Sequence, residues 1–323
     1  MTKLPDGLDR FLASTDWHGA QVEPLTADAS FRRYFRLRTA DDTAMLMHAP
    51  PPHEDPRPFL AAARWLHENG LRAPEILSDD IRGGWVLLED FGDERVLERL
   101  NASPREEDVV YAKAVDTLID LQKVEPGPFA RYDLSTYLRE VDLLPEWWSS
   151  AMNLDVDRQG WTSAWQQVLG PLSERQEPGV TVLRDYHAEN IMLLPDGSQG
   201  LIDFQDALVG HPAYDLVSLL QDARREVPEA IERRMLDRYC ASINAGDQFE
   251  QDYAILGAQR NAKIVGIFTR LSRRDEKHRY LSLIPHVWRM LERDLREPAL
   301  SPVADWFDAN VPADLRERGG ALA

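Results

Sequence analysis

The N-terminal part of the chain alternates short apolar runs with turn-forming residues, a pattern typical of β-strands. One segment differs, because apolar side chains between Arg57 and Glu68 recur at helical spacing and Asn69-Gly70 follows as a stop signal. The predicted strands lie within residues 17–25, 34–37, 44–49, 74–77 and 84–88, and a short helix is predicted at 8–12. Residues 1–92 are therefore expected to form a small β-rich domain.

From residue 93 onward, apolar residues recur with the period of an α-helix. The predicted helices span residues 108–121, 134–144, 161–169, 211–220, 251–271 and 285–295. Pro145, Pro171 and Pro298 follow three of these runs and are expected to end them, because proline lacks the amide hydrogen that a helix needs. Residues 299–323 are expected to form a loosely packed tail. The predicted fold class is α+β, with a larger helical domain at residues 93–323.

Composition and net charge limit the kinds of function that this protein could have. The 323 residues are 43% hydrophobic, enough for a sizeable core, and the net charge of −18 argues against a general affinity for nucleic acid or an anionic membrane. The single cysteine, Cys240, excludes an intrachain disulfide. No signal peptide or bilayer-spanning apolar run is apparent, so a cytoplasmic protein is expected, and the sequence identifies no protein partner.

The most informative stretch runs from Leu183 to Asp206. Asp185 is followed five residues later by Asn190, and two short apolar runs around a Pro-Asp-Gly turn then lead to Asp203. The two runs predict a β-hairpin that holds Asn190 and Asp203 close together at its open end. A carboxylate and an amide oxygen suit Mg²⁺, and Asp185 could accept the proton of an attacking hydroxyl. Either pair alone would also suit a turn cap or a strand end; their combination favours phosphoryl transfer.

This spacing resembles the protein-kinase catalytic loop, D-x-x-x-x-N, followed by the D-F-G metal site. Gln205 stands in place of the glycine, which makes the stretch similar to the aminoglycoside and choline phosphotransferases, and Leu183 stands where protein kinases carry a histidine. The resemblance implies a two-lobed protein-kinase-like fold, with a small nucleotide-binding N-lobe at residues 1–92. The helical C-lobe at 93–323 would hold the catalytic loop, the metal site and a sugar site. It also implies ATP and Mg²⁺ as cofactors, and a bracing role for Asp215.

The nucleotide-binding features of protein kinases are altered in the N-lobe. The segment that would carry a glycine-rich loop reads Asp28-Ala-Ser-Phe-Arg-Arg33 and contains no glycine. Its backbone and arginines could still bind phosphate, or it could be a strand edge with solvated arginines. The strand at 44–49 lacks the ATP-anchoring lysine, and His48 stands roughly in its place. Either an arginine of residues 32–36 replaces it, or metal and backbone hold ATP. The predicted nucleotide-binding residues are Ser30, Phe31, Arg32 and Arg33, together with Glu89 and Phe91 of a hinge-like segment.

Five blocks carry a closer resemblance: DASFRRYFRL, LLEDFGD, LRDYHAENIM, LIDFQDALVGHPAYDL and QRNAKIVGIF. Together they are similar to the bacterial N-acetylmuramate/N-acetylglucosamine anomeric kinases of cell-wall recycling, over most of the chain. The resemblance implies transfer of the γ-phosphate of ATP to the anomeric hydroxyl of these amino sugars. It would also give a purpose to Arg260 and Lys263, tentative substrate ligands that share one arc of the helix at 251–271 with Arg270. The alternative for this arc is a solvated face paired with carboxylates.

Two other functions stay open at this level. One is phosphotransfer to another small hydroxyl compound, such as an aminoglycoside. The other is a nucleotide-binding pseudokinase, which the missing lysine and glycine-rich loop favour. Against the pseudokinase stands the full set of Asp185, Asn190 and Asp203, for which a protein without catalysis has no chemical need.

Overall fold

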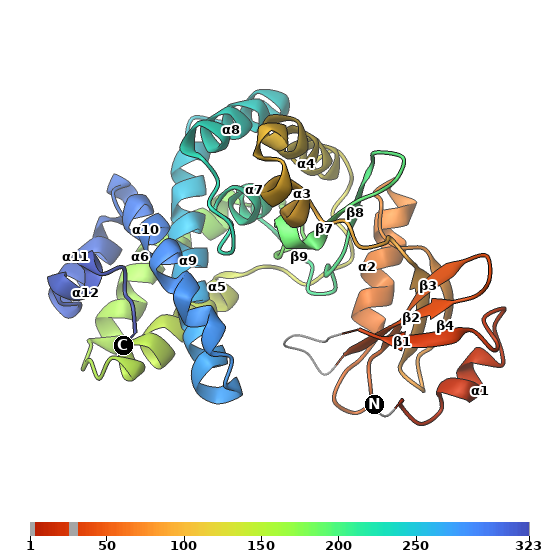
Figure 1. Ribbon diagram of the computed structural model, residues 1–323. Coiled ribbons are helices and arrows are strands. Elements are labelled where there is room, and N and C mark those ends of the chain that lie inside the picture. Colours follow the sequence, from red (N-terminus) through yellow and green to blue (C-terminus); the bar gives the residue numbers. More distant parts are fainter. Residues whose placement is uncertain (1–3, 26–31, 323) are drawn as a thin grey trace. The chain divides into compact units, whose positions relative to one another are not determined.

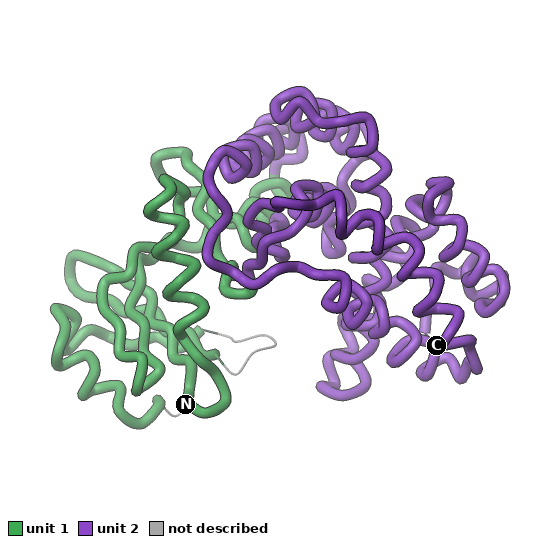
Figure 2. Tube along the Cα trace, turned by 180° about the vertical axis from the view of Figure 1, so that it is seen from behind, with its two compact units in different colours: residues 1–102, 189–206 green, residues 103–188, 207–323 purple. Residues whose placement is uncertain are grey.

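The computed structural model describes residues 4–25 and 32–322. The chain divides into two compact units, unit 1 with residues 1–102 and 189–206, and unit 2 with residues 103–188 and 207–323 (Figure 2). Unit 1 therefore takes in a short segment from far along the sequence, which is the predicted catalytic hairpin. The functional boundary expected after residue 92 stays a prediction.

Unit 1 is built on a five-stranded antiparallel sheet with the strand order β1-β2-β3-β5-β4 (Figure 1). The strands are β1 (Gln21–Pro24), β2 (Arg33–Arg38), β3 (Thr43–His48), β4 (Ile76–Asp80) and β5 (Trp85–Glu89). The helices are α1 (Leu8–Leu12), α2 (Arg57–Glu68) and α3 (Val96–Ala102). Phe11 of α1 packs with Leu46 and Trp85 in an apolar core on one face of the sheet. The predicted β-rich region, with α2 at its predicted bounds, is confirmed.

The hairpin of unit 1 consists of β7 (Ile191–Leu193) and β8 (Gln199–Leu201), which pair in antiparallel register as predicted. Gly197 closes the turn with a φ of 79°, a backbone conformation that glycine adopts without strain. Backbone hydrogen bonds attach both strands to unit 1, from Leu201 N to Arg72 O (2.7 Å) and from Leu193 N to Glu94 O (2.8 Å). These bonds give the hairpin a fixed place within unit 1.

Unit 2 is mostly helical. Its α-helices among the described residues are α4 (Glu107–Leu121), α5 (Leu134–Val141), α6 (Arg158–Arg175), α7 (Ala213–Leu220), α8 (Glu229–Ile243), α9 (Phe249–Asp275), α10 (Ile284–Asp294), α11 (Ser301–Asn310) and α12 (Ala313–Glu317). A π-helix spans Leu144–Ser149, and β6 (Val180–Val182) pairs with β9 (Leu208–Gly210). The 27-residue α9 packs against α5, α7, α10 and the π-helix (Figure 1). Together with the sheet of unit 1, these helices confirm the α+β class.

The structure corrects two expectations about where helices end. Pro171 lies inside α6, and Pro145 lies inside the π-helix. A proline inside a helix costs about 3 kcal/mol, but α6 buries Trp161, Trp165 and Leu172 along its length, and this burial offsets the lost hydrogen bond.

The expected C-terminal tail is also wrong, because residues 301–317 form α11 and α12. Val303, Trp306 and Phe307 are buried and recur at helical spacing, so one side of α11 is apolar. Trp306 packs edge-on against Trp161 of α6, with ring centroids 4.5 Å apart. The C-terminal segment is therefore part of the core of unit 2.

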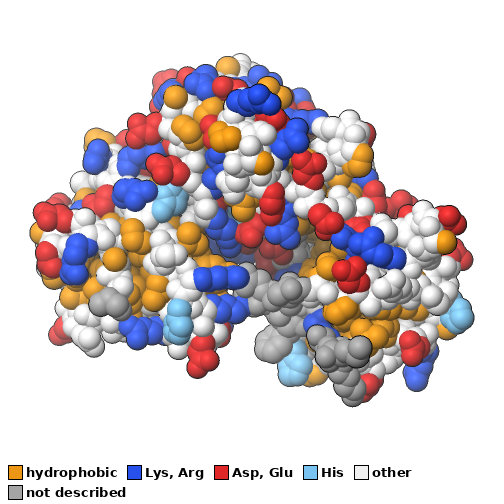
Figure 3. Space-filling model, in the orientation of Figure 1, with side chains coloured by type: hydrophobic (Ala, Val, Ile, Leu, Met, Phe, Trp, Pro, Cys, Tyr) orange, Lys and Arg blue, Asp and Glu red, His pale blue; other side chains and the backbone are white. Residues whose placement is uncertain are grey.

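No helix among the described residues combines the length and apolarity needed to cross a bilayer. Basic and acidic side chains are interspersed over the face drawn in Figure 3. Many of them pair locally, as Arg233 does with Asp237 and Glu250.

Gly266 marks the closest approach of α9 to the segment before the π-helix. A Cβ atom at this position would lie 2.3 Å from the carbonyl carbon and 2.4 Å from the carbonyl oxygen of Leu143. We expect Gly266→Ala to lower the free energy of unfolding by about 2–3 kcal/mol, because backbone must move to admit the methyl group. Gly170→Ala in α6 is the matched control, since nothing lies within 4 Å of its added Cβ. Urea unfolding of both variants tests this, and equal midpoints would contradict it.

Candidate active site

Asn190 and Asp203 lie at the open end of the hairpin in unit 1, as predicted. The Asn190 amide nitrogen is 3.4 Å from Oδ2 of Asp203, and Ile202 N donates to Asn190 O at 3.1 Å. Gln205 Nε2 donates to Oδ1 of Asp203 at 2.9 Å. The Asp203 side chain is exposed, and its backbone has a left-handed φ of 60°. An exposed carboxylate beside an amide fits Mg²⁺, which is bound through one or two protein groups together with waters and phosphates.

Phe204 fixes this end of the hairpin against α2. Its ring stacks on Phe59 with centroids 5.0 Å apart, and it is almost fully buried. Asp203 is therefore held between a buried aromatic residue on one side and the hairpin on the other. Its side chain thus has a defined position in unit 1.

The predicted nucleotide-binding residues of unit 1 fall into three groups. Ser30 and Phe31 lie outside the described residues. Arg32 precedes β2, with its Nε 3.8 Å from Glu54 Oε2, and the Arg33 guanidinium lies 5.2 Å from the centroid of the Phe35 ring.

In the hinge-like segment, the Glu89 carboxylate accepts two hydrogen bonds from Arg72, one of them 2.7 Å long. These bonds hold the pKa of Glu89 below its ordinary value. The Arg72 guanidinium also lies over the Phe91 ring, 4.7 Å from its centroid. Both predicted hinge residues are thus tied to Arg72, and their contact with a nucleotide stays a prediction.

His48 does not stand in for the missing lysine. Its ring stacks on Trp85 with centroids 4.0 Å apart, on the face of the sheet that α1 covers. Strand alternation puts its neighbour Met47 on the opposite face, beside its cross-strand partner Tyr34.

Asp185 lies in unit 2, in a loop that Asp215 of α7 braces as expected. The buried Asp215 carboxylate accepts hydrogen bonds from Leu183 N (2.6 Å) and Arg184 N (2.8 Å). Arg184 has a left-handed φ of 72°, a backbone conformation that is unfavourable for residues other than glycine. The hydrogen bonds from Asp215 therefore help to maintain it. Burial raises the pKa of Asp215 to about 7, although both backbone hydrogen bonds oppose the shift.

We expect Asp215→Asn to lower both the stability of the folded protein and its turnover rate. Asparagine keeps the shape, but its NH₂ group would face one of the two backbone N–H donors and leave that donor without a partner. The free energy of unfolding should fall by about 1–3 kcal/mol, and kcat should fall because Asp185 directly follows the braced amides. Urea unfolding and steady-state kinetics measure the two effects. Asp237→Asn, an exposed change on α8, is the control; equal behaviour of the two variants would refute the bracing role.

Arg260 and Lys263 of α9 point into the interior of unit 2. The Arg260 side chain is only 4% exposed; its Nη2 donates to Ser218 Oγ at 2.7 Å and lies 4.0 Å from Asp185 Oδ1. Lys263 Nζ donates to Glu140 Oε1 at 3.0 Å. Arg260 and Lys263 are therefore largely shielded from solvent beside Asp185 rather than solvated, although Lys263 does pair with a carboxylate, as that alternative expected.

This cluster sets the ionisation of Asp185, whose side chain is about half exposed at 49%. The surrounding protein partly desolvates the carboxylate, which raises its pKa, but the charges of Lys263 and Arg260 outweigh this effect and hold the pKa below its ordinary value. Burial also lowers the pKa of His187 to about 4, so His187 is neutral at neutral pH and adds no charge. Asp185 is thus a carboxylate under physiological conditions, which is the form that can orient or deprotonate a hydroxyl.

Sequence reasoning missed the centre of this cluster, the buried Glu140 of α5. Its carboxylate accepts hydrogen bonds from Arg184, Lys263 and Tyr132, and from Gln259 at 3.2 Å. Nothing in the local pattern around residue 140 marks it. Its role depends on groups more than a hundred residues away that only the fold brings together.

The profile of the phosphotransferase enzyme family matches residues 21–254. The chain belongs to this family. A curated N-acetylmuramate/N-acetylglucosamine kinase from Pseudomonas aeruginosa is 38% identical over 306 residues, which cover 91% of this chain and 89% of the relative. A protein of the same name from Caulobacter vibrioides is 34% identical over 351 residues, covering 95% and 96%.

Among solved structures, the ternary complex of streptomycin, ATP and APH(2")-IIa matches with a TM-score of 0.60 at 14% identity. The match covers 93% of this chain and 98% of that chain. It confirms the predicted fold. With family and fold established, the chain is an ATP-dependent kinase.

Proposed function

We propose that this kinase transfers the γ-phosphate of ATP to the anomeric hydroxyl of N-acetylmuramate and N-acetylglucosamine. The observation that carries the reaction type is Asp185, a half-exposed carboxylate kept ionised beside Arg260 and Lys263. The sugar assignment is supported by the names of relatives that align with about nine-tenths of the chain. We place the reaction in the cytoplasm, where ATP is available, and its sugars among the products of cell-wall recycling.

We assign distinct roles to the residues of the two units. In unit 2, Asp185 orients the sugar hydroxyl and accepts its proton as the bond to phosphorus forms. In unit 1, Asn190 and Asp203 hold Mg²⁺, which neutralises charge on the phosphates. The segment from Ser30 to Arg33 binds phosphate, and backbone groups of Glu89 to Phe91 bind adenine.

Arg260 and Lys263 are assigned to the acceptor side. N-acetylmuramate carries a lactyl carboxylate that N-acetylglucosamine lacks, and cations suit such a group. Lys263 has a 12% exposed side chain and shares Glu140 with Arg184, and Arg260 faces Asp185, so three cations face two carboxylates there. This excess of positive charge supports binding of an anionic sugar.

The test is ³¹P NMR of the purified protein with Mg-ATP and, separately, N-acetylmuramate, N-acetylglucosamine and kanamycin. We expect a sugar 1-phosphate resonance with both amino sugars. A product with kanamycin alone would move the substrate to the aminoglycosides and keep the mechanism. Absence of transfer to every acceptor would refute the proposal and favour a pseudokinase.

A further inference from the structure

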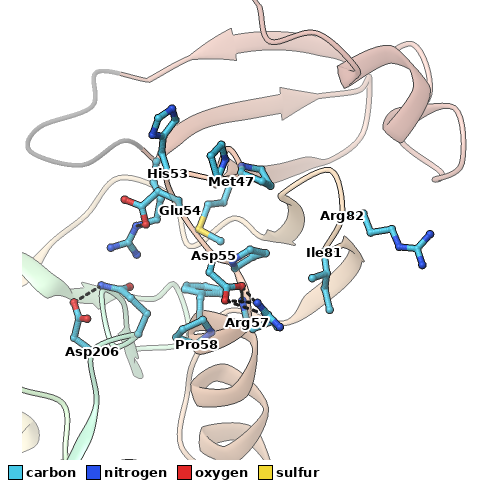
Figure 4. Close-up of a pocket in the computed structure, with 15 residues that line it drawn as sticks. Met47, His53, Glu54, Asp55, Arg57, Pro58, Ile81, Arg82 and Asp206 are labelled. Atoms are coloured by element: carbon cyan, nitrogen blue, oxygen red, sulfur yellow. Dashed lines mark hydrogen bonds and ion pairs between the residues drawn. The ribbon is translucent and has the colours of Figure 1, made fainter.

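Unit 1 contains a cavity of about 680 Å³ next to the predicted metal ligands. Its wall is formed by Arg32, by Met47 of β3, by the segment that leads into α2, and by Gln205 and Asp206, which follow Asp203 (Figure 4). A cavity beside a metal-binding carboxylate is where the phosphates of a nucleotide are expected. Such a site needs positive charge from the protein as well as from the metal.

The strand that lines this cavity supplies no such charge. Met47 is fully buried, and its thioether sulfur accepts a hydrogen bond from Tyr34 OH at 3.4 Å. Burial raises the pKa of Tyr34 to about 12; the nearby charge of Arg32 opposes the shift, and those of Asp203 and Glu54 reinforce it. Tyr34 therefore lies among three charged groups, of which only Arg32 is a cation.

Three arginines line the cavity, and they differ in their surroundings. Arg57 is 72% exposed and pairs with Asp55, and Arg82 is exposed and points away from Glu54 and Asp206 (Figure 4). The Arg32 side chain is only 15% exposed, and its Nε lies 3.8 Å from Oε2 of Glu54, which is 24% exposed. Arg32 is thus the one of these three arginines that is largely buried in the cavity wall.

We propose that Arg32 is the phosphate-binding cation of the nucleotide site, and that Glu54 is a positioning residue that orients it. The inference rests on the proposed function. It assigns phosphate binding to Arg32 and the orientation of Arg32 to Glu54. A guanidinium can bind phosphate oxygens through two parallel N–H groups, a geometry that lysine lacks. The ion pair with Glu54 is made through Nε, at 3.8 Å, so the Nη groups of Arg32 are the ones assigned to phosphate oxygens.

Arg32→Gln should weaken the binding of nucleotides that carry phosphate groups. In metal-free buffer, the Kd for ADP should rise by about tenfold or more, because hydrogen bonds to a charged group are lost. The Kd for adenosine should not change. Isothermal titration calorimetry gives both values without relying on activity. Arg32→Lys should recover part of the ADP affinity, since it restores the charge without the paired N–H groups.

Glu54→Gln should act on turnover more than on affinity. Removing the carboxylate leaves Arg32 charged but poorly oriented, so kcat should fall by about tenfold while the Kd for ADP changes little. In the Arg32→Gln background the same change should have no further effect, because the group it orients is absent. A merely structural role of Glu54 would instead lower kcat in both backgrounds.

Arg38→Gln is the matched control. Arg38 lies on β2, and its Nε pairs with Glu23 at 3.2 Å in an exposed ion pair. It should leave the Kd for ADP and the KM for ATP unchanged.

An unchanged Kd for ADP in Arg32→Gln would overturn the inference, even if the wild-type protein phosphorylates amino sugars. Equal losses of adenosine and ADP affinity would also overturn it, because they would indicate a damaged fold. If the wild type transfers phosphate to no sugar but Arg32→Gln still loses ADP selectively, the inference stands and the proposed function fails.

Discussion

Asp185→Asn should lower kcat by about a hundredfold to ten-thousandfold, the usual contribution of a positioned general base. Asparagine can still accept a hydrogen bond from the sugar hydroxyl, but it cannot take its proton. The KM for ATP should change little, because nucleotide binding is assigned to unit 1. The low pKa of Asp185 means that the folded protein stabilises its carboxylate, so the substitution should also lower the free energy of unfolding. Steady-state kinetics and urea unfolding measure these quantities.

The pH dependence provides a second test of Asp185. Because its pKa lies below the ordinary value, the carboxylate form persists as pH falls from neutrality. Loss of wild-type activity through its protonation should therefore appear only below the ordinary pKa of an aspartate. Asp116→Asn, a change on α4 at a half-exposed carboxylate that pairs with Arg238, is the control and should keep full turnover. If Asp185→Asn kept the turnover of the wild type, Asp185 could not be the group that orients and deprotonates the sugar hydroxyl.

The catalytic hairpin could be predicted from sequence because it is local. Its two apolar runs, its glycine turn and its polar ends lie within a short segment, so neighbouring residues determine their own arrangement. The same holds for α2, where apolar spacing and the Asn69-Gly70 stop gave both bounds. Asp203 was placed for the same reason, since it directly follows the second strand.

The environment of Asp185 could not be predicted, because it depends on packing between distant helices. Periodicity put Arg260 and Lys263 on the polar arc of α9, which on an ordinary amphipathic helix faces water. Most of α9 is buried, so this arc faces Asp185 and Glu140 instead. No spacing within residues 251–271 distinguishes a buried polar arc from a solvated one.

Two errors share another cause, the use of proline as a stop signal. Pro145 and Pro171 were taken as ends, yet Pro145 lies inside the π-helix and Pro171 lies inside α6. A proline's local cost is fixed, whereas the gain from burying Trp161 or Trp306 depends on what those rings contact. Burial of these two tryptophans against each other outweighed the local signal.

Asp203→Asn should lower kcat by about two to three orders of magnitude, because a metal ion supplies several kcal/mol of charge stabilisation in a transition state. Asparagine retains an oxygen ligand but lacks the negative charge that binds Mg²⁺. The Mg²⁺ concentration needed for half-maximal activity should rise. The Kd for ADP in metal-free buffer should stay the same, because the binding of phosphate by Arg32 does not require the metal. Magnesium titrations of activity and calorimetry of ADP binding measure these effects.

Asp196→Asn is the matched control, because it makes the same substitution at the tip of the same hairpin. Asp196 accepts hydrogen bonds from Ser198 N and Oγ there and has no assigned metal role. It should leave the magnesium titration unchanged. An unchanged titration in Asp203→Asn would exclude this carboxylate as a metal ligand. A higher Kd for metal-free ADP in Asp203→Asn would instead indicate that the substitution disturbs the cavity wall at Gln205, whose side chain donates to Asp203. The two results separate a lost ligand from a displaced loop.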